Sequence, residues 1–79
     1  MTDQLNSIIR ARRLTLGQGR RLRTQADLSV DELAGAVGVT GGTLSRWERG
    51  LTRPRGRAAT RWLAACEEIR AALDVEVVA

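Results

Sequence analysis

Apolar residues recur at helical spacing along most of the chain, and interruptions in this pattern divide it into short helices. Between residues 3 and 26 the apolar stripe is loose, and arginines and glycines interrupt it near its middle. Thr15 and Gln18 have the spacing of a capping box, in which each side chain satisfies a free backbone N–H of a first helical turn. The pattern predicts one helix at about 3–13 and a second at about 16–26, with a single bent helix as the alternative.

The middle of the chain predicts two short helices joined by a tight glycine turn. Ser29 and Glu32 form another capping box, so we expect a helix to begin at Val30. Gly38 can adopt the left-handed conformation that ends a helix, and Thr40 can cap the next one. The residues expected to face inward are Leu33, Ala34, Val37, Val39, Leu44 and Trp47.

A longer helix is predicted at about 55–73, after a basic loop from Leu51 to Arg57 that contains the only proline. Its apolar positions recur at helical spacing and are Ala59, Trp62, Leu63, Cys66, Ile69 and Leu73. We expect Trp62 in the core, with a dimer surface as the alternative, and Cys66 as a small buried hydrophobe. The valines of residues 74–79 favour extended structure, so this tail is either a short strand at a dimer interface or a frayed end.

Length and composition indicate one small helical domain. Seventy-nine residues fill one core, and 11 alanines and 10 leucines with no Phe or Tyr suit closely packed helices. The expected fold class is therefore all-α, a bundle of four to five helices. The apolar stretches are far shorter than the roughly 18 residues that span a bilayer, and one cysteine with no histidine suits a reducing compartment. We expect a cytoplasmic protein that makes no membrane contact.

The residue types exclude most catalytic and metal-binding chemistry. With no histidine, one cysteine and no clustered carboxylates, the chain lacks a Cys/His metal set, a Ser-His-Asp triad and a paired-acid site. We therefore expect no enzyme, no cofactor, no metal and no small-molecule ligand. All 13 basic residues are arginines, against nine acids, which gives a net charge of +4. A guanidinium group matches phosphate and guanine edges, so the excess points to nucleic acid, although a GC-rich genome also explains the absence of lysine.

Two helices joined through a glycine turn form the helix-turn-helix arrangement, whose second helix enters the major groove of DNA. The segments that carry it are Leu28-Ser29-Val30-Asp31-Glu32-Leu33-Ala34, Gly38-Val39-Thr40 and Thr43-Leu44-Ser45-Arg46-Trp47-Glu48-Arg49-Gly50. Together they resemble the Cro/repressor type of helix-turn-helix regulators, the xenobiotic-response-element family. The resemblance covers residues 16–66 and leaves 1–14 and 67–79 as extensions. It implies a single DNA-binding domain over residues 1–79, with dimerisation as a role for 67–79.

The chain departs from the family pattern at the start of each of the two helices of the motif. Val30 replaces the glutamine that often opens the motif, and Gly41 and Gly42 stand where polar side chains commonly read bases. Glycine allows close backbone approach to DNA but offers no side-chain readout. The candidate base-readout residues are Thr40, Gly41, Gly42, Thr43, Ser45 and Arg46. Arg46 is the main candidate because its guanidinium can bridge guanine O6 and N7, with a phosphate contact or a solvated position as the alternative.

Other charged residues are expected to act without reading sequence. Phosphate contacts are predicted for Arg49, Arg53, Arg55 and Arg57, with solvated surface charge as the alternative. In the family, an arginine near the end of the first core helix pairs with the glutamate after the recognition helix, which implies a partly buried ion pair between Arg23 and Glu48. The family usually has an aliphatic residue where this chain has Gly19. Ile8 and Ile9 are the nearest apolar residues that could fill that space.

The function that these features predict is transcriptional regulation by occupancy of an operator on double-stranded DNA. A repressor is the leading interpretation, because 79 residues leave no room for an effector-sensing domain. Small members of this family are often phage or plasmid switch proteins, which places this one in a bacterial cytosol. A single recognition helix that starts with two glycines offers few side chains for contacts with bases. We therefore expect a homodimer, which places two such helices on two half-sites. The alternative is an antitoxin or another protein-interaction module on the same scaffold.

Overall fold

The structure, a computed structural model, describes the backbone of residues 2–78 and the side chains of residues 5–74. Its elements in chain order are α1 (Thr2–Arg13), the π-helical turn η1 (Leu14–Gln18), α2 (Gly19–Gln25), α3 (Val30–Val37), α4 (Gly41–Glu48) and α5 (Gly56–Val78). Every regular element in this range is helical, and five of them are α-helices. The predicted all-α fold is confirmed.

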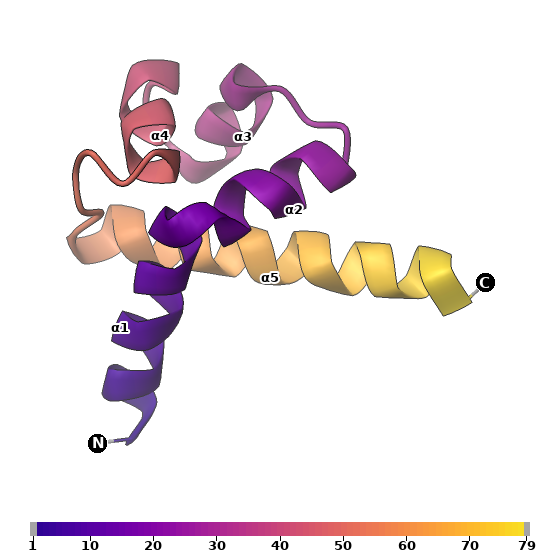
Figure 1. Cartoon of the computed structure of the whole chain (residues 1–79), viewed down its shortest axis with the longest axis horizontal. Helices are drawn as coiled ribbons and strands as arrows, with labels where there is room; N and C mark the ends of the chain where they lie inside the picture. The colour runs from indigo at the N-terminus through magenta and orange to yellow at the C-terminus, as the bar shows by residue number, and fades with distance from the viewer. Residues whose placement is uncertain (1, 79) are drawn as a thin grey trace.

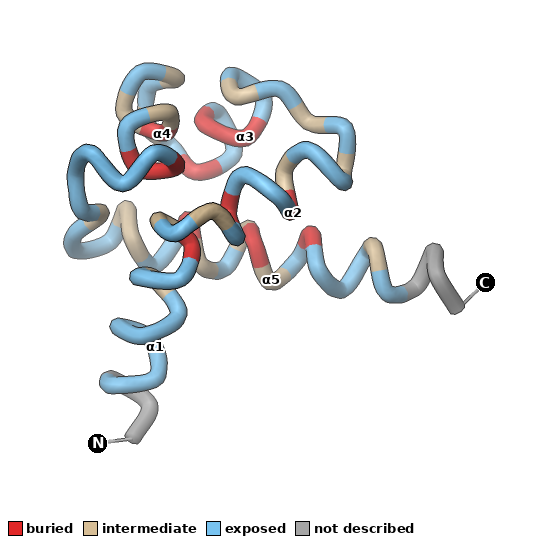
Figure 2. Tube along the Cα trace, viewed as in Figure 1, coloured by how far each residue is buried: buried red, intermediate tan, exposed pale blue. Residues whose placement is uncertain are grey.

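The other helices pack around α5, which runs along most of the length of the molecule (Figure 1). Both α2 and α3 contact α5, whereas α4 packs on α3 and η1. Figure 2 shows buried positions where these helices face one another, while most of α1 is exposed. The buried core residues are Leu14, Leu22, Leu33, Ala34, Val37, Leu44, Trp47, Trp62, Cys66 and Ile69. The helices α3 and α4 therefore pack against the rest of the protein on one side and face solvent on the other.

The break between α1 and α2 differs from the predicted capping box of Thr15 and Gln18. The Thr15 hydroxyl donates back to the carbonyl oxygen of Arg12 at 2.7 Å, and no side-chain cap precedes η1 or α2. The chain instead turns through Leu16 and Gly17, whose backbone angles are not helical, and Gly17 has a φ of 108°. Glycine adopts such a φ without a steric penalty. The region is thus two α-helices joined by a kinked π turn, rather than one bent helix.

The capping residues of α3 and α4 act as the sequence predicts. The Ser29 hydroxyl accepts from the N–H of Glu32 at 3.0 Å, and the Glu32 carboxylate accepts from the N–H of Ser29 at 2.9 Å. This second bond is the main reason why the pKa of Glu32 lies below its usual range. Gly38 ends α3 with a φ of 84°, and the Thr40 hydroxyl accepts from the N–H of Thr43 at 3.1 Å. Both ends of the tight turn are therefore fixed by local hydrogen bonds.

The C-terminal segment is helical, and the expected strand is wrong. The helix α5 continues from Gly56 to Val78, so residues 74–78 extend it. Valine lowers helix stability by less than about 1 kcal/mol, whereas each added residue of an existing helix gains a backbone hydrogen bond. The side chains beyond Asp74, and Ala79 as a whole, lie outside the described residues. At the other end, Arg57 belongs to the first turn of α5 rather than to the preceding loop.

Trp62 occupies the space that Gly19 leaves, so the role expected for Ile8 and Ile9 is wrong. The Trp62 side chain is fully buried, and its ring centroid lies 5.2 Å from that of Trp47. A Cβ atom added to Gly19 would lie 2.6 Å from Cζ2 of Trp62. Two carbon atoms that are not bonded to each other do not approach so closely in proteins. Ile8 and Ile9 both remain 45% exposed. Glycine in α2 therefore admits a large ring from α5, and Trp62 lies in the core rather than at a dimer surface.

The burial of Cys66 predicts that its thiol reacts slowly in the native protein. Cys66 is 2% exposed, and burial is the main cause that raises the pKa of its thiol to about 11. Because the thiolate is the reactive form, the native protein should react slowly with an aromatic disulfide reagent at pH 7 and faster as the pH rises toward 11. In urea the exposed thiol should react at an ordinary rate. Equal rates for native and unfolded protein at pH 7 would contradict the buried position.

The contact between Gly19 and Trp62 predicts that Gly19→Ala destabilises the protein, although alanine favours helices. The methyl group would displace the Trp62 ring, so we expect a loss of about 1–3 kcal/mol in the free energy of unfolding. The control is Gly35→Ala in α3, where nothing lies within 4 Å of the added Cβ. There we expect a gain of about 0.5–1 kcal/mol. Urea unfolding followed by tryptophan fluorescence measures both changes, and a stabilising Gly19→Ala would refute the close contact.

Candidate nucleic-acid interface

An ion pair between α2 and α4 fixes the end of α4. The Arg23 guanidinium donates from Nε to Oε2 of Glu48 at 2.8 Å and from Nη2 to Oε1 at 3.0 Å. Its Nη1 donates to the carbonyl oxygen of Leu28 at 2.9 Å, so Arg23 also holds the link before α3. The hydrogen bond with Glu48 raises the pKa of Arg23, while burial acts in the opposite direction. These are the two residues that the family resemblance pairs.

The Arg23–Glu48 pair is nearly excluded from water. Its side chains are 11% and 4% exposed, respectively. Burial of two charges costs free energy that only good geometry offsets, and here two parallel hydrogen bonds provide it. The other ion pair among the described residues joins Arg10 and Glu67 at 3.5 Å, with side chains 60% and 43% exposed. The first pair is therefore a structural link between helices, and the second is an ordinary surface contact.

The helix α4 has one side in the core and one side in solvent. Leu44 and Trp47 are buried, whereas Gly42, Arg46 and Arg49 are exposed at the spacing i, i+4, i+7. The other predicted base-readout residues border this exposed side, with Thr40 exposed and Gly41, Thr43 and Ser45 half-buried. The structure thus brings the whole predicted set onto or beside one polar face of α4.

The two glycines at the start of α4 have different surroundings. A Cβ atom added to Gly41 would overlap the carboxylate of Asp31 in α3, an exposed side chain, so glycine lets this carboxylate lie against the start of α4. A Cβ atom at Gly42 would meet only the Arg46 guanidinium, at 3.6 Å. That guanidinium also donates a long hydrogen bond, 3.5 Å, to the Thr43 hydroxyl. Arg46 therefore lies over the first turn of α4, on the surface that a side chain at position 42 would cover.

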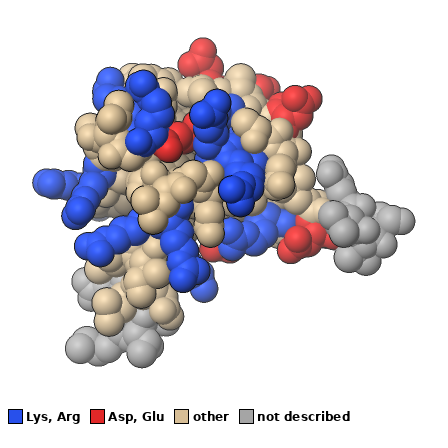
Figure 3. Space-filling view, viewed as in Figure 1, with Lys and Arg blue, Asp and Glu red and all other residues tan. Residues whose placement is uncertain are grey.

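The four predicted phosphate-binding arginines follow one another along the chain from the end of α4 to the first turn of α5. Arg49 follows the helix, Arg53 and Arg55 lie in the next loop, and Arg57 lies in the first turn of α5; all four are exposed. None of the four forms an ion pair with a described residue. Figure 3 shows arginine side chains over α1, α2 and α4, while acidic side chains lie mainly toward the upper and right edges of the view. Several exposed guanidinium groups without acidic partners create a positive potential that attracts anions.

Arg61 has a role that the sequence pattern did not indicate. Its Nε donates to the carbonyl oxygen of Val37 at 2.7 Å, and its guanidinium also lies beside Gly38. A cation at the C-terminus of a helix satisfies a free carbonyl group and interacts favourably with the helix dipole. Arg61 thereby ties α5 to the turn before α4. Helical periodicity places this residue only on the polar side of α5, and it carries no signal for the distant helix end.

The sequence of the chain matches a known protein family over the helix pair α3 and α4 and the helices next to it. The helix-turn-helix family matches residues 20–74, which is more than half of the chain. The chain belongs to the Cro/repressor type of helix-turn-helix proteins. This is a family of DNA-binding transcription regulators, and the match includes α2, α3, α4 and most of α5 but not α1 or η1. No curated protein and no solved structure matches the chain.

The described part of this helix-turn-helix protein lacks both a membrane-spanning helix and a metal-binding cluster. No helix there is long and apolar enough to cross a membrane. The described residues also contain no group of three or more His, Cys, Asp or Glu side chains that could hold a metal ion.

The burial of Arg23 and Glu48 predicts strong coupling in a double-mutant cycle. Arg23→Ala or Glu48→Ala alone leaves a buried charge without its partner, so each should lower the free energy of unfolding by about 3 kcal/mol. The double variant buries neither charge, and its loss should be far smaller than the sum. Urea unfolding of the four proteins measures the coupling.

Arg10 and Glu67 provide the matched control for this cycle. Because their pair is exposed, the same cycle there should give a coupling of only about 0–1 kcal/mol. Additive losses for Arg23 and Glu48, or equal coupling in the two cycles, would contradict the structural role of the buried pair.

Proposed function

We propose that this protein is a transcriptional repressor that occupies an operator on double-stranded DNA as a homodimer, in the cytosol of a bacterium and of the phage or plasmid switch type. The observation that carries the proposal is the polar face of α4, opposite the buried Leu44 and Trp47. A helix packed on one side and polar on the other fits the major groove, which is about 12 Å wide. A bound protein excludes others from the same DNA, which is how a repressor acts.

Arg46 is the central base-reading residue in this proposal. Residues in the first turns of a recognition helix contact base edges, and the Arg46 guanidinium lies over that part of α4. Gly42 beneath it has no side chain that would hold the DNA away. The remaining polar groups of this turn are Thr40, Thr43, Ser45 and the backbone of Gly41. An arginine in this place can donate to both O6 and N7 of a guanine.

The arginines around the end of α4 are proposed to bind phosphates. Arg49, Arg53, Arg55 and Arg57 are exposed and have no ion-pair partner among the described residues. Arg49 uses only its Nε, in a long hydrogen bond of 3.4 Å to the carbonyl oxygen of Ser45. Phosphate contacts fix the register of a protein on the duplex without reading its sequence. Two copies related by a two-fold axis would place two α4 helices on half-sites about 34–36 Å apart.

A second candidate function is binding to a protein partner, as in an antitoxin. The observation that favours it is apolar exposure on α1, where Leu5, Ile8 and Ile9 face solvent. The dependence of DNA affinity on salt separates the two candidates. Each neutralised phosphate contributes about −0.9 to the slope of log K against log salt. A steep slope on duplex DNA supports the repressor, whereas no measurable affinity for any duplex supports the protein-interaction module.

Selection of binding sites from random duplexes tests the roles of the arginines. Arg46→Ala should relax the base preference at one position in each half-site and cost roughly 1–3 kcal/mol of binding free energy. Arg55→Ala should weaken all duplexes about equally and reduce the salt slope, because it removes a phosphate contact. The selected wild-type sequence also gives the symmetry and the half-site spacing. An unchanged sequence preference for Arg46→Ala would contradict its base-reading role.

A further inference from the structure

The helix α1 lies outside the family match and has basic residues of its own. It precedes the matched residues 20–74, and its last turn contains Arg10, Arg12 and Arg13. Arg10 forms an exposed ion pair with Glu67 of α5 at 3.5 Å. Arg12 is exposed and forms no ion pair with a described residue. Contacts within the described part of the chain therefore give the Arg12 guanidinium no partner.

The end of α1 lies beside the end of α4, because η1 packs on α4. Gly50, which follows α4, approaches η1 so closely that an added Cβ atom would lie 3.2 Å from the carbonyl oxygen of Thr15. The Thr15 hydroxyl in turn donates to the carbonyl oxygen of Arg12 at 2.7 Å, which ties η1 to the last turn of α1. This short path from α4 through Gly50 and Thr15 brings Arg12 next to the loop after α4.

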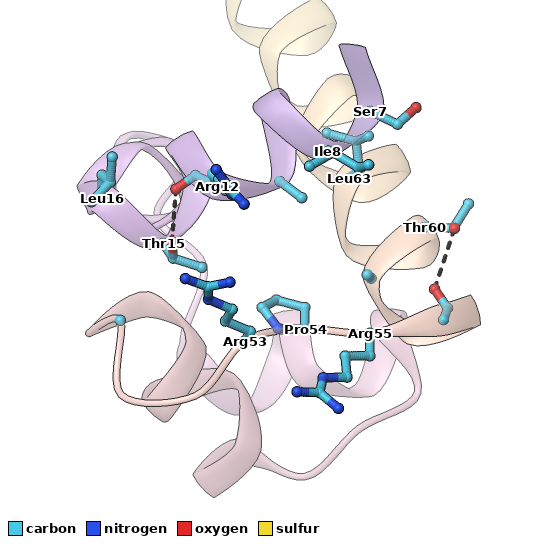
Figure 4. A pocket seen from close by; sticks show the side chains of 14 residues that line it. Ser7, Ile8, Arg12, Thr15, Leu16, Arg53, Pro54, Arg55, Thr60 and Leu63 are labelled. Carbon is cyan, nitrogen blue, oxygen red and sulfur yellow. Dashed lines mark hydrogen bonds between the residues drawn. The ribbon is translucent and has the colours of Figure 1, made fainter. Parts of the chain in front are cut away.

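Arg12 and Arg53 line one groove, which has a cavity volume of about 690 Å³. The groove lies between α1, η1, the loop after α4 and the first turns of α5, and none of its lining residues is acidic. Figure 4 shows the two side chains on the same side of the groove as Thr15, whereas Arg55 lies apart from them. Like charges on neighbouring segments repel each other, and an anion bound between them removes this repulsion.

The surroundings of the groove favour a DNA phosphate as this anion. Ile8 and Leu63 give the groove apolar walls, and such walls around charges of one sign strengthen the attraction of an anion. Arg49 and Arg53, on the path from α4 to the groove, are already proposed to bind the backbone. A DNA strand has one phosphate for roughly every 3.4 Å along the duplex axis. A strand that meets Arg53 therefore also has a phosphate near Arg12.

We propose that α1 is part of the DNA-binding surface, and that Arg12 binds the phosphate that Arg53 holds or the next one on the same strand. The contact rests on the proposed binding to double-stranded DNA and extends it to a helix that the family match does not include. Its ligand is the sugar-phosphate backbone, so Arg12 adds affinity and fixes register without reading sequence.

The salt dependence of binding to the selected operator duplex tests this contact. Arg12→Ala should weaken binding about 10-fold at low salt and make the slope of log K against log salt shallower by about 0.9 for each bound copy. Arg12→Lys keeps the charge and should restore the slope. Arg13→Ala is the matched control, because Arg13 is exposed on the same helix but does not line the groove. It should leave the affinity and the slope nearly unchanged, and circular dichroism verifies that each variant folds.

Ethylation of single phosphates locates the contact, because it removes the negative charge of the phosphate. Arg12→Ala should lose sensitivity to ethylation where Arg53→Ala loses it, or at the next phosphate on the same strand. Equal affinity and slope for Arg12→Ala and Arg13→Ala, an unchanged ethylation pattern, or a change only at distant phosphates overturns the contact and leaves the repressor in place. A wild-type protein that binds no duplex overturns the proposed function and this contact together.

Discussion

The position of α4 depends on an ion pair from which water is almost excluded. Charges removed from water are stabilising only when their remaining donors and acceptors are satisfied. Arg23 meets this condition with three hydrogen bonds, two to Glu48 and one to the chain before α3. One side chain therefore connects α2, the link to α3 and the end of α4. Because α4 has only eight residues, this anchor and the buried Trp47 together set the angle at which its polar face meets solvent.

The core beside this pair depends on a large difference in side-chain size between neighbouring helices. The chain has no Phe or Tyr, so its two tryptophans supply the aromatic volume of the core. Trp62 on α5 lies between Gly19 of α2 and Trp47 of α4, and thus spans the space among three helices. Glycine inside a helix costs up to about 1 kcal/mol relative to alanine, and the buried ring explains why it stands there. The ring contacts α2 and α4, which are the two helices that the ion pair joins.

Features that act within one helical turn could be predicted from the sequence, whereas contacts between distant helices could not. Gly38 and the capping residues beside it satisfy backbone groups three or four positions away, so spacing alone identifies them. The same spacing at Thr15 was misleading because Gly17 turns the chain into a left-handed conformation before the box can close. Periodicity likewise predicted the exposed face of α4. It could not predict Asp31 beside the start of that helix or Arg61 at the end of α3, because packing angles bring these residues together.

The charges around α4 differ at its two ends, and this difference limits how the helix can meet a duplex. The N-terminus of a helix ordinarily attracts a phosphate, but here the carboxylate of Asp31 lies against Gly41 and repels one. At the other end Arg49 and Arg53 are exposed without acidic partners among the described residues. In the proposed complex the phosphates therefore lie at the C-terminal end of α4 and its following loop, and the first turn faces the bases.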